Sequence, residues 1–171
     1  KMLLAIAASN RWGLKHIDVK RAYFYAKVLR EIYVEIDEKD KKEEEGDIVG
    51  RLNFAMYGTR DAASSWEACY IEVLTKAGFA LGKFTPCVFR RDKVVVTVHG
   101  DDFTCTGPEV ELQWLRKSMQ GTFEITHEML GPDAAHSQEV RILNRVIRWT
   151  KEGLSYEPYQ RHADIANREL G

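Results

Sequence analysis

The sequence predicts an α+β fold in which helices cover an antiparallel sheet. Residues 86–107 contain two runs rich in β-branched residues, then a turn and a third run, which is typical of strands joined by hairpins. Residues 61–79 place apolar side chains at helical spacing between a candidate N-cap, Asp61, and Gly78. Because strands and helices alternate irregularly, this fold class is favoured over a doubly wound parallel sheet.

Further elements are expected on both sides of these two segments. Strands are expected where β-branched and aromatic residues gather, over residues 14–19, 31–36 and 48–53. A second helix is expected over residues 107–123, with Pro108 at its first position. In the last part of the chain, two strands are expected over residues 140–150 and 153–157, joined as a hairpin by a turn at 151–153. A helix is expected over residues 159–170.

Composition bounds the function only modestly. The chain has 171 residues, 44% of them hydrophobic, which suits one compact domain with at most a small appendage. The formal net charge of −1 does not by itself indicate a nucleic-acid partner. The charge is uneven, however. Residues 1–36 carry seven basic and three acidic side chains, whereas residues 37–47 carry three basic and seven acidic ones and predict a solvated loop.

The cysteines and the apolar runs indicate a protein of the cell interior. Cys69, Cys87 and Cys105 lack CxxC spacing and a paired histidine cluster, so we expect reduced thiols rather than disulfides or a structural zinc site. No signal peptide opens the sequence and no apolar run is long enough to span a membrane, so we expect a soluble protein that is not secreted. Because the first residue is Lys1, we expect a segment of a longer protein.

Two adjacent aspartates follow the valine-rich strand in the stretch VVVTVHGDDFTCTG. Gly100 allows a turn at Asp101 and Asp102, and an acidic pair after glycine is by itself common at a surface hairpin tip. Two carboxylates about 4 Å apart repel by roughly 4 kcal/mol at an effective dielectric constant of 20. A third converging acid would therefore imply a bound cation. Asp18, near the end of the predicted strand 14–19, is the candidate, although a single such acid is more often a cap or turn residue.

Several segments together resemble the reverse transcriptase of Ty1/copia-type retrotransposons. HIDVKRAYFYAKVLREIYVEI, VGRLNFAMYGTRDAASSWEACYIEVLTKAGF and VVVTVHGDDFTCTG follow the order of the family's DVKTAFLNG, EEIYMEQP, KLKKSLYGLKQAPRAW, LLEMGF and YVDDLLITG. The tail, ILNRVIRWTKEGLSYEPYQRHADIANREL, is similar to the family's FLGIEI, GIxLSQ and YIxxIL run, so the resemblance covers essentially the whole chain. Several weak motifs in the right order are more specific than any one of them.

The resemblance implies a polymerase palm with truncated fingers and thumb. Residues 1–135 would be the palm with a remnant of the fingers, and residues 136–171 a primer-grip-like hairpin and the start of the thumb. The implied activity is that of an RNA-directed DNA polymerase, a nucleotidyltransferase that adds dNTPs to a primer 3′-hydroxyl on an RNA or DNA template. The implied partners include the rest of a retrotransposon polyprotein, with integrase upstream and RNase H downstream, in a cytoplasmic particle or the nucleus.

The implied catalytic residues are the three aspartates. Asp18, Asp101 and Asp102 would hold two Mg²⁺ or Mn²⁺ ions, of which one activates the 3′-hydroxyl and the other steadies the triphosphate and the leaving pyrophosphate. Magnesium prefers a few carboxylates together with substrate phosphates. Asp102 is the weaker candidate ligand, because strand alternation can aim its side chain away from the cluster.

Other site residues are also carried over from the resemblance. Nucleotide binding is implied for Arg21, Ala22, Tyr23, Tyr57 and Gly58. Tyr23 would exclude a ribose 2′-hydroxyl, the alternative being an ordinary core aromatic. Contacts with primer or template are implied for His99, Gly100, Arg141, Arg145 and Arg148. The three arginines occupy the place of the family's primer-gripping hairpin, although they could equally belong to an exposed strand edge.

Departures from the family pattern leave alternatives open. His99 and Gly100 stand where the family commonly has Tyr-Val, and Asp61 introduces an acid along the expected nucleic-acid track. The lysine that protonates pyrophosphate has no clear counterpart, and His127 is a candidate substitute. A catalytically decayed palm is therefore one alternative. A nucleotidyl cyclase is another, because HGDDF is similar to its hairpin, but the interval from Asp18 to Asp101 is longer than that compact domain usually allows.

Overall fold

The computed structural model of the chain describes residues 1–41, 48–158, 165 and 168–169. The chain divides into two compact units. The first combines Lys1–Val19 with Phe79–Gly171, and the second is Lys20–Gly78. Both boundaries fall inside the region predicted as palm, and the assignment of palm and thumb to residues 1–135 and 136–171 stays a prediction.

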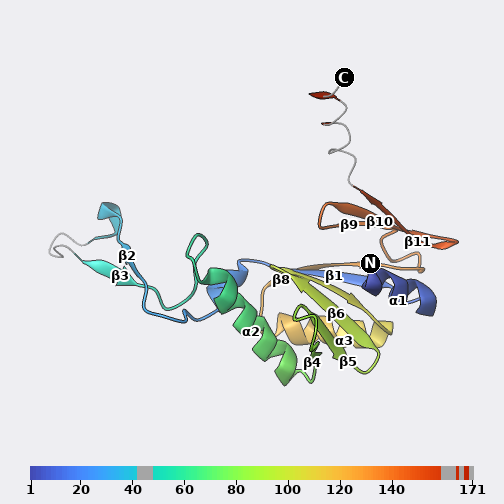
Figure 1. The fold of residues 1–171 in the computed structure, drawn as a ribbon, viewed down its shortest axis with the longest axis horizontal. Helices are drawn as coiled ribbons and strands as arrows, with labels where there is room; N and C mark the ends of the chain where they lie inside the picture. Colours follow the sequence, from blue (N-terminus) through green and yellow to red (C-terminus); the bar gives the residue numbers. More distant parts are fainter. Residues whose placement is uncertain (42–47, 159–164, 166–167, 170–171) are drawn as a thin grey trace. The chain divides into compact units, whose positions relative to one another are not determined.

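An antiparallel sheet forms the centre of the first unit (Figure 1). Its strands are β1 (Leu14–Val19), β4 (Ala80–Leu81), β5 (Val88–Arg91), β6 (Val94–His99), β7 (Asp102–Thr106) and β8 (Ile125–Leu130). They are ordered β4-β5-β6-β7-β1-β8, so β1 from the start of the chain is paired on both sides. Together with the helices, this sheet confirms the mixed helical and antiparallel architecture that the sequence predicts.

The two faces of the sheet pack against different helices. One face carries buried side chains of β1 and β7, namely Lys15, Ile17, Val19, Phe103 and Cys105. Lys15 on this face lies within electrostatic reach of Glu109 and Arg116 on α3 (Glu109–Gln120). The opposite face contributes to a core cluster with α1 (Met2–Asn10), whose members from the sheet are Leu14, Val95 and Leu130. Because side chains alternate along β1, His16 and Asp18 also lie on this second face.

A smaller sheet follows in the first unit. Its strands are β9 (Glu139–Ile142), β10 (Arg145–Thr150) and β11 (Gly153–Pro158), and β10 pairs with both others. The predicted β10–β11 hairpin is confirmed, but the single strand predicted over 140–150 is wrong. Leu143 and Asn144 have φ angles of 49° and 57°, which split that segment into a tight hairpin. The helix predicted over 159–170 falls almost wholly on residues outside those that the structure describes.

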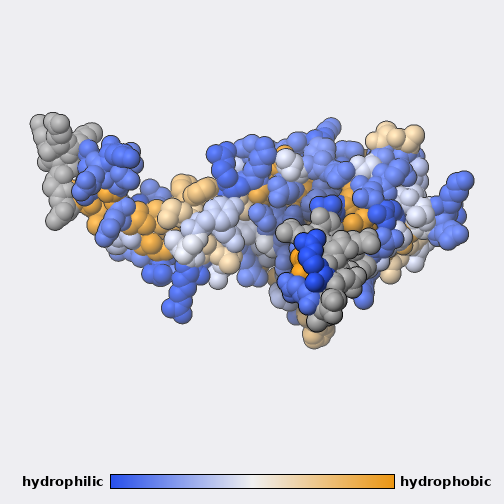
Figure 2. Space-filling view, turned by 90° about the horizontal axis from the view of Figure 1, so that it is seen from above, coloured by the Kyte–Doolittle hydropathy of each residue, from blue (hydrophilic) through white to orange (hydrophobic). Residues whose placement is uncertain are grey.

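The second unit contains one long helix, α2 (Ala62–Lys76), and a two-stranded ribbon. The remaining elements are η1 (Ala22–Tyr25), β2 (Tyr33–Glu35), η2 (Glu38–Asp40) and β3 (Val49–Arg51). Asp61 precedes α2 as predicted, and its carboxylate pairs with Arg30, which offsets the acid on the expected nucleic-acid track. Two strands cannot bury their apolar side chains alone, and Figure 2 shows hydrophobic residues at the surface of this ribbon. Val49 of β3 is one of the exposed apolar side chains. Residues 42–47 of the predicted solvated loop lie outside the described part.

Three elements of the first unit have no counterpart in the sequence prediction, namely α1, β4 and β8. In addition, Pro108 is the N-cap of α3 rather than its first helical residue. Among the helices of the described residues, none combines the length and the apolar character that crossing a bilayer requires.

Candidate active site

Asp18 and Asp102 are direct partners across the neighbouring strands β1 and β7. In an antiparallel pair, opposite residues point to the same face with Cβ atoms about 4.5–5.5 Å apart. The register therefore places both side chains on one face of the sheet, although alternation along a single strand suggested that Asp102 could point away. Whether Asp102 is the weaker ligand of the three aspartates stays a prediction.

Asp101 lies in the tight turn between β6 and β7. His99 pairs with Asp102, which leaves Gly100 and Asp101 as the two central residues of the hairpin loop. Gly100 has a φ of 63°, and a positive φ at the first central residue alone is typical of a type II′ turn. The backbone N–H of Val19 donates to the carbonyl oxygen of Asp101 at 3.1 Å, so the turn is tied to the strand that carries Asp18.

The surroundings of the aspartates combine burial with mutual repulsion. Burial raises the pKa of the Asp102 carboxyl, the nearby charge of His16 lowers it, and the charges of Asp101 and Asp18 raise it. The Nε2 atom of His16 lies 3.3 Å from Oδ1 of Asp102. The Asp102 carboxylate is therefore repelled by the other two, and a bound cation would relieve this repulsion.

Two side chains next to the aspartates were not identified from the sequence. His16 pairs with Asp102, and the hydroxyl of Thr126 on β8 donates to Oδ2 of Asp18 at 3.3 Å. His16 stands two residues before Asp18 on the same strand, so its shared face was a usable signal. Thr126 depended on the pairing of β8 with β1, which the sequence did not reveal. A depression of about 340 Å³ opens beside them, lined by His16, Asp18, Thr126, His127 and Glu128.

The aspartates suit a hard divalent cation by their chemistry. Carboxylate oxygens are the protein ligands that Mg²⁺ prefers, and Asp18 and Asp102 present them from one face. The carboxylate oxygens of the three aspartates are not all within 4.8 Å of one another. Elsewhere in the described part of the chain, one other set of three potential ligands is that close. The fit therefore rests on the facing pair and on the backbone position of Asp101.

His127 does not share the face of the aspartates. It is opposite Ile17 in the register of β8 against β1, whereas Thr126 is opposite Asp18. Burial lowers the pKa of His127, and the charges of Lys15 and Arg116 lower it further. A neutral imidazole is a poorer proton donor, which argues against His127 as the substitute for the missing lysine.

Three of the predicted nucleotide-binding residues come together in the second unit. The rings of Tyr23 and Tyr57 lie with centroids 4.4 Å apart, at an interplanar angle of 56°. Gly58 follows with a φ of 87°, and a Cβ added there would meet nothing within 4 Å. Arg21, with a φ of 54°, precedes η1, and Ala22 at the start of η1 is buried.

The three predicted primer-contacting arginines do not share one face of the smaller sheet. Arg141 and Arg148 lie on the outer face, whereas Arg145 lies on the face of the buried Ile142 and Ile147. Arg148 donates to Glu157 at 2.6 Å and to Glu139 at 2.5 Å, and these hydrogen bonds raise its pKa. The two carboxylates offset the charge that Arg148 would offer to a phosphate.

The chain is similar to a family of polymerases and to parts of several transposon polyproteins. The model of the family "Reverse transcriptase (RNA-dependent DNA polymerase)" matches residues 1–134. The chain is 23% identical over 139 residues to the retrovirus-related Pol polyprotein from transposon TNT 1-94 of Nicotiana tabacum, which covers 77% of this chain and 10% of that protein. It is 25% identical over 119 residues to the corresponding polyprotein from transposon RE2 of Arabidopsis thaliana, covering 66% of this chain and 8% of that protein. A third relative is the transposon Ty1-BL Gag-Pol polyprotein of Saccharomyces cerevisiae, 24% identical over 104 residues, which covers 58% of this chain and 6% of that protein.

Proposed function

We propose that this chain is a polymerase palm that supplies the catalytic carboxylates of RNA-directed DNA synthesis. The chain belongs to the reverse transcriptase (RNA-dependent DNA polymerase) family, in the form found in Ty1/copia-type Pol polyproteins. One observation carries the proposal. Asp18 faces Asp102 across β1 and β7, and the adjoining turn with Asp101 is tied to Val19. This arrangement brings the acids of two distant sequence motifs to one end of one sheet.

The aspartates would hold two Mg²⁺ or Mn²⁺ ions. When bound, such ions activate the primer 3′-hydroxyl and neutralise charge on the phosphates. Thr126 orients Asp18 by donating to one of its oxygens, so the other oxygen remains for a ligand. His16 engages Oδ1 of Asp102, which makes Asp102 the weaker of the two turn aspartates as a ligand.

Residues of the second unit would shape the nucleotide site. The contact with Tyr57 limits the positions of the Tyr23 ring, and a fixed ring beneath the sugar discriminates against a 2′-hydroxyl by its bulk. No protein atom would lie within 4 Å of a Cβ at Gly58, so a base or a template backbone would approach the chain there without obstruction from that side. Backbone amides at Arg21 and Ala22 would face the triphosphate.

The primer and template would meet the first unit at its hairpins. His99 and Gly100 stand at the tip of the β6–β7 hairpin beside Asp101. Among the three arginines, Arg148 is the weakest candidate for a phosphate contact, because it is paired with two carboxylates, and Arg145 lies over the Tyr156 ring, 6.0 Å from its centroid. A grip of this kind calls for further basic groups, since duplex affinity grows with the number of phosphates neutralised.

The relatives support one of the proposed partners, the rest of a Pol polyprotein. The chain spans a tenth or less of the length of the Pol polyproteins that it matches. We therefore propose that it acts within such a polyprotein, on a primed RNA or DNA template with dNTPs as substrates.

Primer extension tests this function. The polyprotein that carries this chain is assayed for Mg²⁺-dependent extension of a DNA primer on an RNA template. Asp18→Asn should reduce the rate of primer extension at least about 100-fold. Mutating a residue that only hydrogen-bonds to a metal ligand typically costs about 10–100-fold in activity, and the loss of a ligand itself should cost more. Asp92→Asn is the matched control, since Asp92 lies in the turn at the other end of β6 with a φ of 49° that asparagine tolerates.

The outcomes separate the alternatives. Extension by the unaltered protein and by Asp92→Asn, but not by Asp18→Asn, supports the proposal. Extension that survives in Asp18→Asn would overturn the assignment of Asp18. A complete lack of template-directed product from the unaltered protein would favour a catalytically decayed palm, in which His99 and Gly100 in place of Tyr-Val are the first residues to revert.

A further inference from the structure

We infer that Glu109, Asp133 and His136 form a binding site for a divalent transition-metal ion such as Zn²⁺, distinct from the aspartates at the end of β1. Each residue can offer one ligand atom, and these three atoms lie within 4.8 Å of one another. Within the described part of the chain this is the one set of three that meets that criterion. The residues are 24 and 3 positions apart in the sequence and belong to none of the family's motifs considered above.

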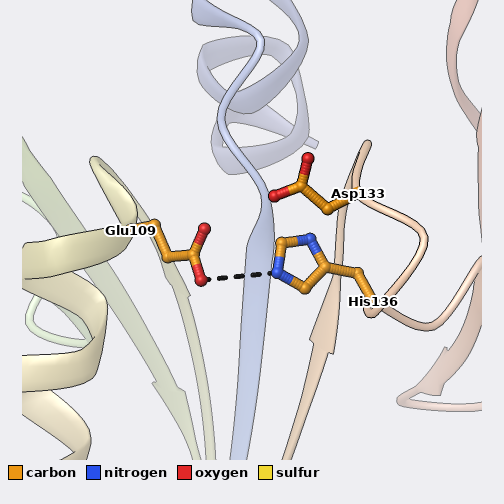
Figure 3. Close-up of side chains that lie close together, drawn as sticks. All are labelled: Glu109, Asp133 and His136. Atoms are coloured by element: carbon orange, nitrogen blue, oxygen red, sulfur yellow. Dashed lines mark ion pairs between the residues drawn. The ribbon is translucent and has the colours of Figure 1, made fainter.

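The three side chains come from two segments that meet beside β1 (Figure 3). Glu109 belongs to the first turn of α3, whereas Asp133 and His136 belong to the loop between β8 and β9. Figure 3 shows both carboxylates and the imidazole directed toward a common space between the helix and the loop. A bound ion would therefore join the start of α3 to the loop that follows β8.

The state of His136 is the second observation that points to a ligand. Its side chain is only 10% exposed, and its Nδ1 atom is buried with no hydrogen-bond partner among the described residues. Burial of Nδ1 without a partner shows that packing, rather than hydrogen bonds of both nitrogens, holds the ring in this place. The other ring nitrogen, Nε2, is thereby kept beside Glu109, where it can act as the ligand atom.

The distance from His136 to Glu109 suits shared coordination. Nε2 of His136 lies 3.4 Å from Oε1 of Glu109, beyond the range of an ordinary N–H···O hydrogen bond. Two ligand atoms that are each about 2.1 Å from a tetrahedral Zn²⁺ are about 3.4 Å apart. These two atoms therefore need little movement to receive an ion, and Asp133 needs at most a modest approach.

The loop that carries His136 and Asp133 is braced in its own right. The side-chain amide of Gln138 donates to the carbonyl oxygens of Gly131 at 3.3 Å, Asp133 at 3.4 Å and His136 at 3.2 Å. The backbone N–H of His136 donates to the carbonyl of Asp133 at 2.9 Å. Gly131 makes room for the ring, since a Cβ there would lie 2.5 Å from Nδ1 of His136. The ligands are thus held before any ion arrives, which reduces the entropy lost on binding.

The donor set selects the class of ion. One imidazole nitrogen and two carboxylates suit Zn²⁺ and similar ions, whereas Mg²⁺ prefers oxygen ligands alone. Two negative charges offset the charge of a divalent ion. The side chain of Glu109 is 47% exposed and Asp133 is exposed, so an ion has access from solvent and a water can complete the coordination.

Zinc binding to the 171-residue chain tests the inference. Isothermal titration calorimetry should show one Zn²⁺ ion bound tightly per chain. Co²⁺ in place of Zn²⁺ should give the visible absorption spectrum of a four- or five-coordinate ion. His136→Ala and Glu109→Gln should each weaken the affinity for Zn²⁺ at least about tenfold. Asp18→Asn should leave this affinity unchanged, which separates the site from the proposed catalytic one.

Thermal unfolding of the unaltered chain and of Glu109→Gln, with and without Zn²⁺, gives a second test of the site. If His136→Ala does not fold, Glu109→Gln alone suffices, because Glu109 is half-exposed and its loss leaves no buried charge. Zn²⁺ should raise the thermal midpoint of the unaltered chain and not that of Glu109→Gln. Absence of Zn²⁺ binding, or equal affinity in Glu109→Gln and the unaltered chain, would overturn the site and leave an ion pair between His136 and Glu109.

Discussion

The two candidate metal sites of the first unit are built in different ways. At the end of β1, strand register brings Asp18 opposite Asp102, and every proposed ligand is a carboxylate. At the start of α3, a helix and a loop bring two carboxylates together with an imidazole. Backbone pairing sets the position of the first site, whereas side chains on a braced loop set the second. On this account, one small sheet offers separate sites to a hard ion and to a borderline ion.

A histidine next to a carboxylate occurs in both sites, so that pair alone does not define a transition-metal site. His16 lies 3.3 Å from Asp102 and His136 lies 3.4 Å from Glu109, and in both rings Nδ1 is buried without a partner among the described residues. The difference is the third ligand atom, which only the second site places within 4.8 Å. We therefore expect Zn²⁺ to prefer the second site, and Mg²⁺ to bind the first with the help of substrate phosphates.

The largest expected effect concerns the ranking of the turn aspartates. In the polyprotein that carries this chain, Asp101→Asn should reduce the rate of primer extension at least about 100-fold, and Asp102→Asn about 10-fold, because one oxygen of Asp102 is already engaged by His16. Initial rates at saturating dNTP measure both. A greater loss in Asp102→Asn than in Asp101→Asn would show that the facing pair, rather than the turn, holds the ions.

An effect of intermediate size should separate the second site from the first. Gly131→Ala places a Cβ 2.5 Å from Nδ1 of His136, so it should lower the free energy of unfolding by about 1–3 kcal/mol and weaken Zn²⁺ binding. Gly121→Ala is the control, because its nearest contact would be an ordinary 3.4 Å from a carbonyl oxygen and its φ is −67°. Urea unfolding with and without Zn²⁺ measures both. An unchanged Gly131→Ala would mean that the ring of His136 is not confined.

The smallest expected effect concerns Lys15, which lies on the face of β1 opposite Asp18. Burial lowers the pKa of Lys15 below 10.5, and the charge of Arg116 lowers it further. Between that lowered value and 10.5 the unfolded chain binds more protons, so stability rises with pH in this window. Lys15→Met should therefore raise the free energy of unfolding by about 1 kcal/mol at pH 7, with a gain that shrinks toward pH 10.5.

Lys15→Met also bears on the two sites. The Lys15 charge acts on Glu109, so its removal should modestly tighten Zn²⁺ binding at the second site. Urea unfolding across pH and Zn²⁺ titration check these outcomes together. A loss of stability at pH 7 would show that the lysine is fully paired in the native state.

The sequence predicted correctly those elements whose periodicity and turn residues lie within one short segment. The strand at 14–19, the hairpin that carries the two aspartates and the helix after Asp61 each have their periodicity and their turn residues within one short segment. The proximity of Asp18 to the turn followed from strand ends and from the family resemblance. The twin positive φ angles at Leu143 and Asn144 were missed, because leucine is a rare residue in such a turn.

What the sequence did not reveal depends on contacts between distant segments. β8 is an edge strand with mostly exposed side chains, so it lacks the alternation of a half-buried strand, and its pairing with β1 places Thr126 beside Asp18. α1 is apolar on more than one side and has no clear stripe. Glu109, Asp133 and His136 meet only because the loop after β8 returns to the start of α3. A Pro-Asp-x-x-His stretch was the one signal for that cluster in the sequence.

Binding of Mn²⁺ to the 171-residue chain tests the central claim most directly, because it requires neither template nor primer. Glu109→Gln is introduced first, so that the second site does not contribute, and unbound Mn²⁺ is followed by electron paramagnetic resonance. In this background we predict that Asp18→Asn weakens Mn²⁺ binding clearly and that Asp92→Asn, in the distant turn, leaves it unchanged. Equal Mn²⁺ affinity in the background chain and in Asp18→Asn would contradict the assignment of the facing aspartates as the catalytic metal site.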